Sequence, residues 1–201
     1  MIFRPRINLA GLIGKRKLTL ASRSPRRMKL LKEANVSFEV TTPKINEKNV
    51  SKNPRQHVLR LSKMKAKSVL SEVESGLVLG ADTIVVLDGE ILGKPKNRKE
   101  AKRMLGKLSN REHKVYTGLT LIDKDKKKTI SNCECTKVRF NSLSSEDIDN
   151  YISTGEPVDK AGAYGIQGKG SRLVGEIKGS LDNVIGLPMD KLEEMLIHIL
   201  R

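Results

Sequence analysis

Runs of Val, Ile and Leu alternate with turn residues and charged stretches along the whole chain. Within residues 77–95, two apolar runs flank Asp88-Gly89. Asp-Gly between such runs predicts a two-residue hairpin, because both turn positions tolerate positive φ. The hairpin would bring Asp82, at the start of the run IVVL, into the neighbourhood of Lys94.

Cap residues and apolar spacings of three and four predict the helices. The short strand LTLAS runs directly into a helix with Ser24 at its N-cap and Pro25 at its first position. Asn53 and Pro54 open a long helix over residues 55–74, whose apolar stripe is interrupted by Lys65. Further helices are expected over RKEAKRMLGKL, SSEDIDNYIS and MDKLEEMLIHIL, and strands over FEVTT, HKVYTGLTLI, TISNCECTKVRF and LVGEIKG.

Two arginines stand where helix electrostatics disfavours cations. Arg26 and Arg27 lie in the first turn of the helix that begins at Ser24, next to the positive end of its dipole. A bound anion would offset both the dipole and the two charges, so the strand, turn and helix predict a phosphate site. The alternative is that both arginines lie along the helix at the surface.

Lys65, Asp82 and Glu47 are three further charged residues that could belong to such a site. Lys65 interrupts its own apolar stripe, and either reaches the edge of the core or reaches an anion. Asp82 begins a strand that looks buried, where an ionised carboxylate needs a partner or a metal, unless it caps the strand in water. With Glu47, these residues supply cations for phosphates and two carboxylates for Mg²⁺ or Mn²⁺.

A glycine-dense segment, EPVDKAGAYGIQGKGSRLV, precedes the last predicted strand. Such a segment either lets the backbone approach a ligand closely or builds a mobile loop. Its specific polar side chains are Asp159, Lys160, Tyr164 and Gln167. The chain contains no GxxxxGK[ST] loop and no GxGxxG after a strand, which argues against a P-loop ATPase and a dinucleotide oxidoreductase.

The formal net charge of +16 indicates a polyanionic partner: nucleic acid, an anionic membrane surface or a phosphorylated small molecule. Aromatic residues make up 3% of the chain, with no Trp, so stacking platforms for single strands are scarce and nucleic acid is not expected. No run approaches the ~18 apolar residues that span a bilayer. Cys133 and Cys135 are too close to staple separate elements, and reduced thiols in the cytoplasm are expected.

The first seventeen residues hold five basic residues and no acid. Their apolar core is too short for a signal peptide. We interpret residues 1–17 as a basic N-terminal extension that is disordered or loosely packed. Residues 18–201 are then a single domain, since neither an internal repeat nor a linker interrupts them.

Several motifs in order carry a family resemblance. LASRSPRR, GADTIVV, ILGKP, HKVYTG, GEPVDKAGAYGIQG and NVIGLP extend from Leu18 to the last helix. In this order they resemble the Maf family of nucleoside triphosphate pyrophosphatases. The resemblance implies an α/β fold with a mixed twisted sheet flanked by helices, akin to the inosine triphosphate pyrophosphatases. It further implies a cytoplasmic, usually dimeric house-cleaning enzyme that cleaves nucleoside triphosphates to monophosphate and pyrophosphate.

The resemblance also assigns roles to residues. Asp82 would act as general base or metal ligand, Glu47 would support the metal, and Lys65 and Lys94 would act with Asp82 in catalysis. The substrate would be held by Ser22, Ser24, Arg26, Arg27 and Gln167. Gln167 follows AYGI as in the pyrimidine-directed subgroup, which implies dTTP and UTP as substrates, together with modified uridine nucleotides.

Two positions depart from the family pattern, Ser109-Asn110 before the HKVYTG motif and Leu181 before NVIGLP. Both lie outside the expected phosphate site, so they bear on substrate fit more than on the chemistry. The competing hypothesis is a nucleic-acid- or partner-binding regulator of cell division that uses the basic surface. Salt dependence separates the two, because a nucleic-acid binder loses affinity steeply as salt rises.

Overall fold

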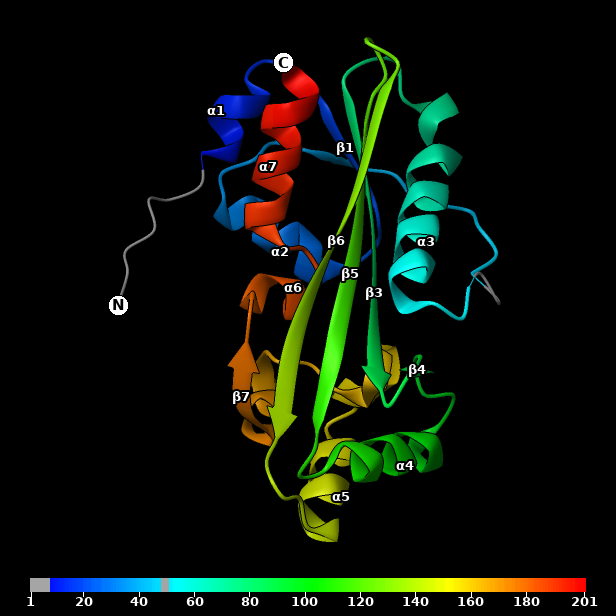
Figure 1. Cartoon of the computed structure of the whole chain (residues 1–201), viewed down its shortest axis with the longest axis vertical. Helices are drawn as coiled ribbons and strands as arrows, with labels where there is room; N and C mark the ends of the chain where they lie inside the picture. Colours follow the sequence, from blue (N-terminus) through cyan, green and yellow to red (C-terminus); the bar gives the residue numbers. More distant parts are fainter. Residues whose placement is uncertain (1–7, 48–50) are drawn as a thin grey trace.

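The computed structural model describes residues 8–47 and 51–201 of the chain (Figure 1). Seven strands form one sheet in the order β2-β1-β3-β5-β6-β7, and β4 pairs with β3 outside this path. The strands are β1 (Leu18–Ala21), β2 (Glu39–Val40), β3 (Leu77–Leu87), β4 (Glu90–Leu92), β5 (Glu112–Asp123), β6 (Lys128–Phe140) and β7 (Val174–Lys178). β1 runs parallel to β2 and β3, whereas all other pairs are antiparallel. The predicted mixed α/β fold is confirmed.

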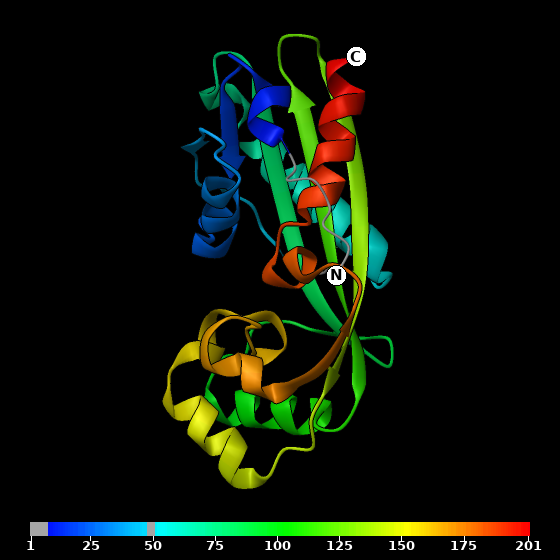
Figure 2. The same cartoon turned by 90° about the vertical axis from the view of Figure 1, so that its left-hand side faces the viewer.

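Helices flank this sheet on both faces. They are α1 (Leu9–Ile13), α2 (Pro25–Glu33), α3 (Pro54–Ser68), α4 (Arg98–Leu108), α5 (Ser145–Ser153), α6 (Leu181–Ile185) and α7 (Met189–Leu200), with the 3-10 turns η1 (Leu70–Glu72), η2 (Glu156–Asp159), η3 (Ala161–Ala163) and η4 (Gly168–Leu173). α3 covers one face of β3 and β5, and α7 lies on the other face with α1 beside it (Figures 1 and 2). None of the helices in residues 8–47 and 51–201 has the length and apolar character to cross a membrane.

Local signals in the sequence set the starts of these elements. The side chains of Asn53, Asn97 and Ser144 each accept a hydrogen bond from a backbone N–H in the first turn of the helix that follows, as caps do. Asp88 (φ 49°) and Gly89 (φ 82°) form the predicted hairpin turn between β3 and β4. The long helix that opens at Asn53 is shorter than expected, because α3 ends at Ser68 and a 3-10 turn follows.

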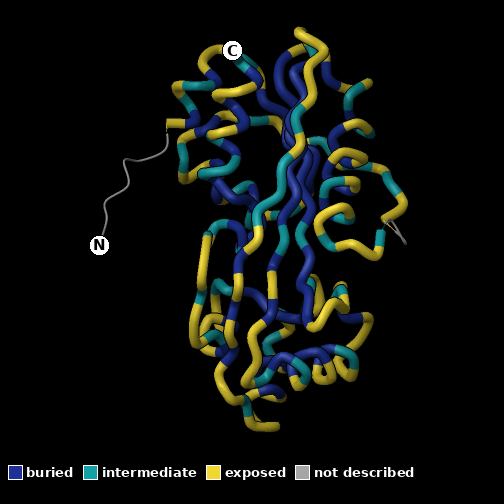
Figure 3. The backbone as a smooth tube through the Cα atoms, viewed as in Figure 1, coloured by how far each residue is buried: buried dark blue, intermediate teal, exposed yellow. Residues whose placement is uncertain are grey.

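The two largest apolar cores of the described residues lie at opposite ends of the long strands β3, β5 and β6. The upper core packs α1, α2 and α7 on the sheet around Leu31, Leu79 and Leu196. The lower core packs α4, α5 and the glycine-dense segment around Leu105 and Phe140. Figure 2 shows the two parts joined by these strands. β3 and β5 stay largely buried as they pass between the two parts, whereas β6 is more exposed (Figure 3). The arrangement leaves room for a site between the cores.

The N-terminal segment differs from the prediction where it is described. Leu9 and Ile13 are buried in the upper core, so loose packing is wrong for residues 9–13. The physical reason is that these two apolar side chains, four residues apart, share one helix face and meet α7. Residues 1–7 of the predicted extension lie outside the described residues, and the boundary before Leu18 stays a prediction.

Candidate functional site

A cavity of about 620 Å³ opens between the two cores. β1 pairs with β3 as far as Ala21 opposite Gly80, and β4 pairs with β3 only from Val85 onward. Residues 81–84 of β3 therefore have no neighbouring strand on this side within the described part of the chain. Asp82 and Thr83 belong to this open stretch and line the cavity. The cavity thus lies beyond the carboxyl end of a parallel strand, where α/β proteins usually bind ligands.

The structure brings nearly all of the predicted site residues to this cavity. Its lining includes Ser22, Ser24, Arg26, Arg27, Glu47, Lys65, Asp82 and Lys94. Gln167 is the exception, since it is half-buried and does not line the cavity although Gly165 and Ile166 do. The glycine-dense segment therefore forms one wall, with its turns η2 and η3 next to the cavity.

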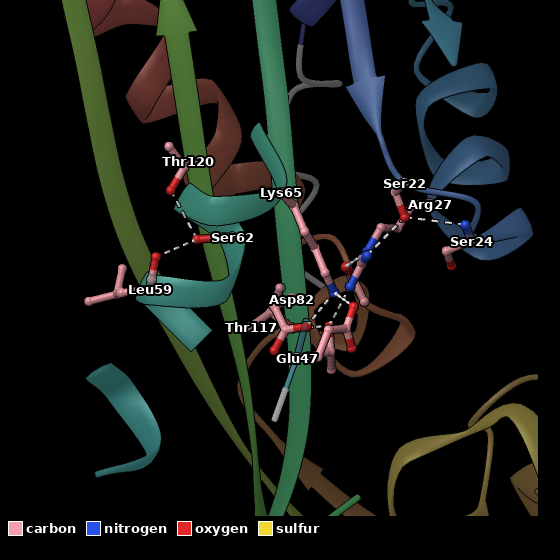
Figure 4. A network of polar contacts seen from close by, with 12 residues as sticks. Ser22, Ser24, Arg27, Glu47, Leu59, Ser62, Lys65, Asp82, Thr117 and Thr120 are labelled. Carbon is pink, nitrogen blue, oxygen red and sulfur yellow. Dashed lines mark hydrogen bonds and ion pairs between the residues drawn. The ribbon is translucent and has the colours of Figure 1, made fainter. Parts of the chain in front are cut away.

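An ion-paired lysine lies at the centre of the site. Lys65 Nζ on α3 donates to Asp82 Oδ1 on β3 at 2.7 Å, and lies 2.9 Å from Glu47 Oε1 (Figure 4). The Lys65 and Asp82 side chains are 10% and 9% exposed, whereas that of Glu47 is 54% exposed. Lys65 thus turns toward the cavity and not to the edge of the core, and Asp82 is not a solvated strand cap.

The two carboxylates remain available to a further ligand. Asp82 Oδ2 is buried and has no hydrogen-bond partner among the described residues. Burial raises the pKa of Glu47, but the hydrogen bond and charge of Lys65 and the charges of Lys94 and Arg27 lower it further, so its net shift is downward. Glu47 is therefore ionised at neutral pH, and it shares Lys65 with Asp82, whose second carboxylate oxygen has no partner among the described residues.

These two acids fit a divalent metal that takes part of its coordination from substrate. Mg²⁺ is commonly held by one or two carboxylates together with phosphate oxygens and water. No cluster of three or more His, Cys, Asp or Glu is present in residues 8–47 and 51–201, so a site built from protein ligands alone is not found there. Cys133 and Cys135 are free thiols on β6, and neither lines the cavity.

Arg27 is a buried cation beside the cavity. Its Nε donates to Gly186 O at 2.8 Å, its Nη1 to Ser22 Oγ at 3.0 Å and its Nη2 to Thr83 Oγ1 at 3.1 Å. All three acceptors are neutral, and no carboxylate among the described residues forms an ion pair with it. Burial lowers the pKa of Arg27, and the nearby charge of Asp82 partly opposes this. A buried guanidinium held by neutral groups is suited to an anionic ligand, and the surface alternative is wrong for Arg27.

A chain of hydroxyl groups, which sequence reasoning missed, fixes this arginine. Thr83 Oγ1 lies 2.9 Å from Thr117 Oγ1, and Thr117 Oγ1 donates to Asn183 O at 3.1 Å. Each hydroxyl has one hydrogen, so Thr83 donates to Thr117 and accepts from Arg27. Thr117 and Asn183 belong to the motifs HKVYTG and NVIGLP, but only the fold shows that they position Arg27 through Thr83.

Arg26 pairs across the cavity. Its Nη1 donates to Asp159 Oδ2 at 3.2 Å, and Asp159 Oδ1 accepts from Lys160 Nζ at 2.7 Å. Asp159 and Lys160 belong to the glycine-dense segment, whose Gly162 adopts φ 68°. A Cβ at Gly162 would come within 3.0 Å of the Val85 side chain, so this glycine allows the segment to close on β3.

The cavity thus combines several cations with two carboxylates at its centre. Guanidinium and ammonium groups can bind several phosphate oxygens, and a carboxylate can accept a proton from water. Apolar side chains of Ile84, Ile91, Ile166 and Val184 also line the cavity, where a planar ring could pack. The arrangement can hold a phosphorylated ligand that also has an apolar part.

Comparison with known proteins agrees with these features. A family model described as Maf-like protein matches residues 17–199. A protein of Carboxydothermus hydrogenoformans is 48% identical over 88% of this chain and 95% of its own length, and one of Clostridium acetobutylicum is 47% identical over 90% and 96%. Both are named dTTP/UTP pyrophosphatase. The Ham1 protein of Staphylococcus aureus aligns with 91% of this chain and 99% of its own, at 13% identity and a TM-score of 0.47, which is too distant to bear on function.

Proposed function

The chain belongs to the Maf family, and on this premise we propose that it hydrolyses nucleoside triphosphates, dTTP and UTP in particular, to the monophosphate and pyrophosphate. The observation that carries the proposal is the Lys65–Asp82 pair in the wall of a cavity lined by further cations. Modified pyrimidine nucleotides belong to the same proposal. We also propose that the protein is a homodimer and lies in the cytoplasm, and the family resemblance supports both.

The phosphates would lie between α2 and β3. Ser22 Oγ accepts from Ser24 N–H at 3.2 Å and from Arg27 at 3.0 Å, which leaves its own hydrogen to donate. The first turn of α2 adds free backbone N–H groups and the positive end of a helix dipole. Arg26, Arg27 and Lys94 would neutralise the phosphate charge from three directions.

The hydrolysis needs a base for one water molecule. Asp82 would accept a proton through Oδ2, because its Oδ1 is held by Lys65. The water oxygen would form a bond to the α-phosphorus, the bond from this phosphorus to the bridging oxygen would break, and pyrophosphate would leave with both electrons of that bond. Lys65 would keep the Asp82 carboxylate oriented, and Lys94 would neutralise the charge that develops on the leaving group.

A divalent cation belongs to this proposal. The chemistry that Mg²⁺ or Mn²⁺ supplies when bound is neutralisation of phosphate charge. Glu47 would hold it through its ionised carboxylate, and Asp82 would hold it through the partner-free Oδ2 where that oxygen serves as a metal ligand in place of the base. Gln167 would reach the base, since an amide can both donate to and accept from a pyrimidine edge. Its neighbours Gly165 and Ile166 already line the cavity.

A nucleotide panel tests the proposal. Purified protein with Mg²⁺ or Mn²⁺ should release pyrophosphate from dTTP and UTP, and a coupled assay would measure the rate for each nucleotide. Absence of release from all ordinary and modified nucleotides would rule out the enzyme. Affinity for nucleic acid that falls steeply with salt, in a protein without such turnover, would support the binding regulator.

A further inference from the structure

The cavity is lined by a third carboxylate, that of Asp159, which has no role in the proposed hydrolysis. Glu47 and Asp82 both contact Lys65, at the side where the water and metal are proposed. Asp159 contacts Arg26 and Lys160 on the side formed by the glycine-dense segment. A carboxylate so close to the phosphate-binding cations would repel the substrate, so its presence there needs a reason.

The Arg26–Asp159 pair joins two parts of the molecule that enclose the cavity. Arg26 is in the first turn of α2, which packs in the upper core, and Asp159 ends η2, which lies with the lower part (Figure 2). The residues are separated by 133 positions in the sequence, and both line the cavity. The contact therefore joins two walls of the cavity, one formed by α2 and the other by the glycine-dense segment.

The pair is charged but weak. Burial alone would raise the pKa of Asp159, but the hydrogen bonds and charges of Lys160 and Arg26 lower it below its ordinary value, so Asp159 is ionised. The Arg26 and Asp159 side chains are 31% and 62% exposed. Exposed ion pairs contribute only about 0–1 kcal/mol. A polyphosphate, with several oxygens and higher charge, can displace this carboxylate from Arg26.

We propose that Asp159 is a displaceable counter-ion, which holds Arg26 while the cavity is free of phosphate and yields it to the incoming substrate. This inference rests on the proposed function, because it takes Arg26 as a phosphate ligand. A carboxylate and a phosphate oxygen compete for the same Nη1–H donor. Asp159 thereby weakens the binding of polyphosphate, and it recovers Arg26 when pyrophosphate leaves.

Calorimetric titration of the full chain with inorganic tripolyphosphate, and separately with pyrophosphate, tests this without turnover or metal. Asp159→Asn keeps the shape of the side chain and removes its charge, so the dissociation constants of this variant for both polyphosphates should fall by about twofold to fivefold, the size of one exposed ion pair. Asp159→Glu keeps the charge and should bind as the wild type does. Asp149→Asn is the matched control, because Asp149 pairs with Lys102 at 2.7 Å on an exposed surface and does not line the cavity.

A second pair of variants assigns the effect to Arg26. Arg26→Gln and Arg26→Gln/Asp159→Asn should bind tripolyphosphate equally, because Asp159 then has no Arg26 to occupy. A gain that persists in the double variant would show that Asp159 acts through Lys160 or through its charge at longer range, and would overturn the inference. If the wild type binds the polyphosphates and Asp159→Asn binds them equally well or more weakly, the inference is overturned. The proposed function then stays intact. If the wild type bound neither polyphosphate, the phosphate site itself would fail, and the inference with it.

Discussion

Lys65 Nζ lies 2.7 Å from Asp82 Oδ1, and both side chains are about nine-tenths buried. The pair connects α3 to β3 at the stretch of β3 between its pairing with β1 and its pairing with β4. A buried carboxylate and a buried ammonium each need a partner, so the two residues hold each other in the cavity wall. One carboxylate oxygen is thereby fixed, and the other is left for chemistry.

Asp82→Asn should abolish most of the activity while keeping the fold. The amide has the shape of the carboxylate but cannot accept the proton of a water molecule or balance a metal ion. We expect turnover of dTTP to fall by about 10² or more. Asp88→Asn, after the end of the same strand, is the control and should hydrolyse dTTP at the wild-type rate. Asp88 is exposed, and its position at positive φ accepts Asn as well as Asp. Unchanged turnover in Asp82→Asn would leave Asp82 with a structural role alone.

Thr117→Val should weaken substrate binding through Arg27. The valine removes the hydroxyl that accepts from Thr83 and donates to Asn183 O. Thr83 can then point its hydrogen elsewhere, and Arg27 loses a fixed acceptor. We expect a higher KM for dTTP and a loss of about 1–3 kcal/mol in the free energy of unfolding.

Thr120→Val is the matched control for this variant. Thr120 is also fully buried on β5 and bonds to Ser62 Oγ and Ser131 Oγ, away from Arg27 (Figure 4). It should lose comparable stability with no change in KM. Equal KM values in the two variants would show that Thr117 does not position Arg27.

Leu9→Ala tests whether the segment before Leu18 is part of the folded domain. Leu9 is fully buried in the upper core, and replacing a buried leucine by alanine costs about 2–4 kcal/mol in the free energy of unfolding. Lys15→Ala, in the exposed turn after α1, should change it by less than about 0.5 kcal/mol. Urea unfolding measures the free energy of unfolding of both variants. Equally small changes in the two would show that Leu9 is not part of the core that unfolds cooperatively.

Local sequence signals predicted the parts of the fold that depend on a few adjacent residues. The Asp88-Gly89 turn and the cap at Asn53 are of this kind. Charged residues in awkward positions, such as Lys65 and Asp82, pointed to the cavity because burial of a charge is costly wherever it occurs.

Other features depend on partners that are remote in the sequence. Thr117 and Asn183 are neutral polar residues whose role appears only when β5, α6 and α2 meet around Arg27. α1 has five residues, which is too short to be stable by itself, and forms because the upper core receives it. Arg26 and Asp159 likewise show no pattern in the sequence that could have paired them.

His113 should make stability depend on pH in the acid range. Its ring is buried in the lower core, with Nε2 at 2.7 Å from Tyr164 Oη, and burial lowers its pKa to about 4 in spite of the opposing charge of Glu112. In the unfolded chain a histidine takes up its proton near pH 6.5. Between pH 6.5 and 4 the unfolded state therefore binds one proton more, and the free energy of unfolding should fall as the pH falls, by about 3 kcal/mol in all.

Urea unfolding at several pH values between 7 and 4 measures this dependence. His113→Gln cannot titrate, so its free energy of unfolding should be lower at neutral pH, where Tyr164 has lost its partner, and should decline less steeply toward pH 4. His57→Gln serves as a histidine replacement outside the lower core, because His57 lies half-buried on α3 with its Nδ1 3.0 Å from Ser51 O. A His113→Gln profile parallel to that of the wild type would show that acid destabilisation comes from other groups, the paired carboxylates first among them.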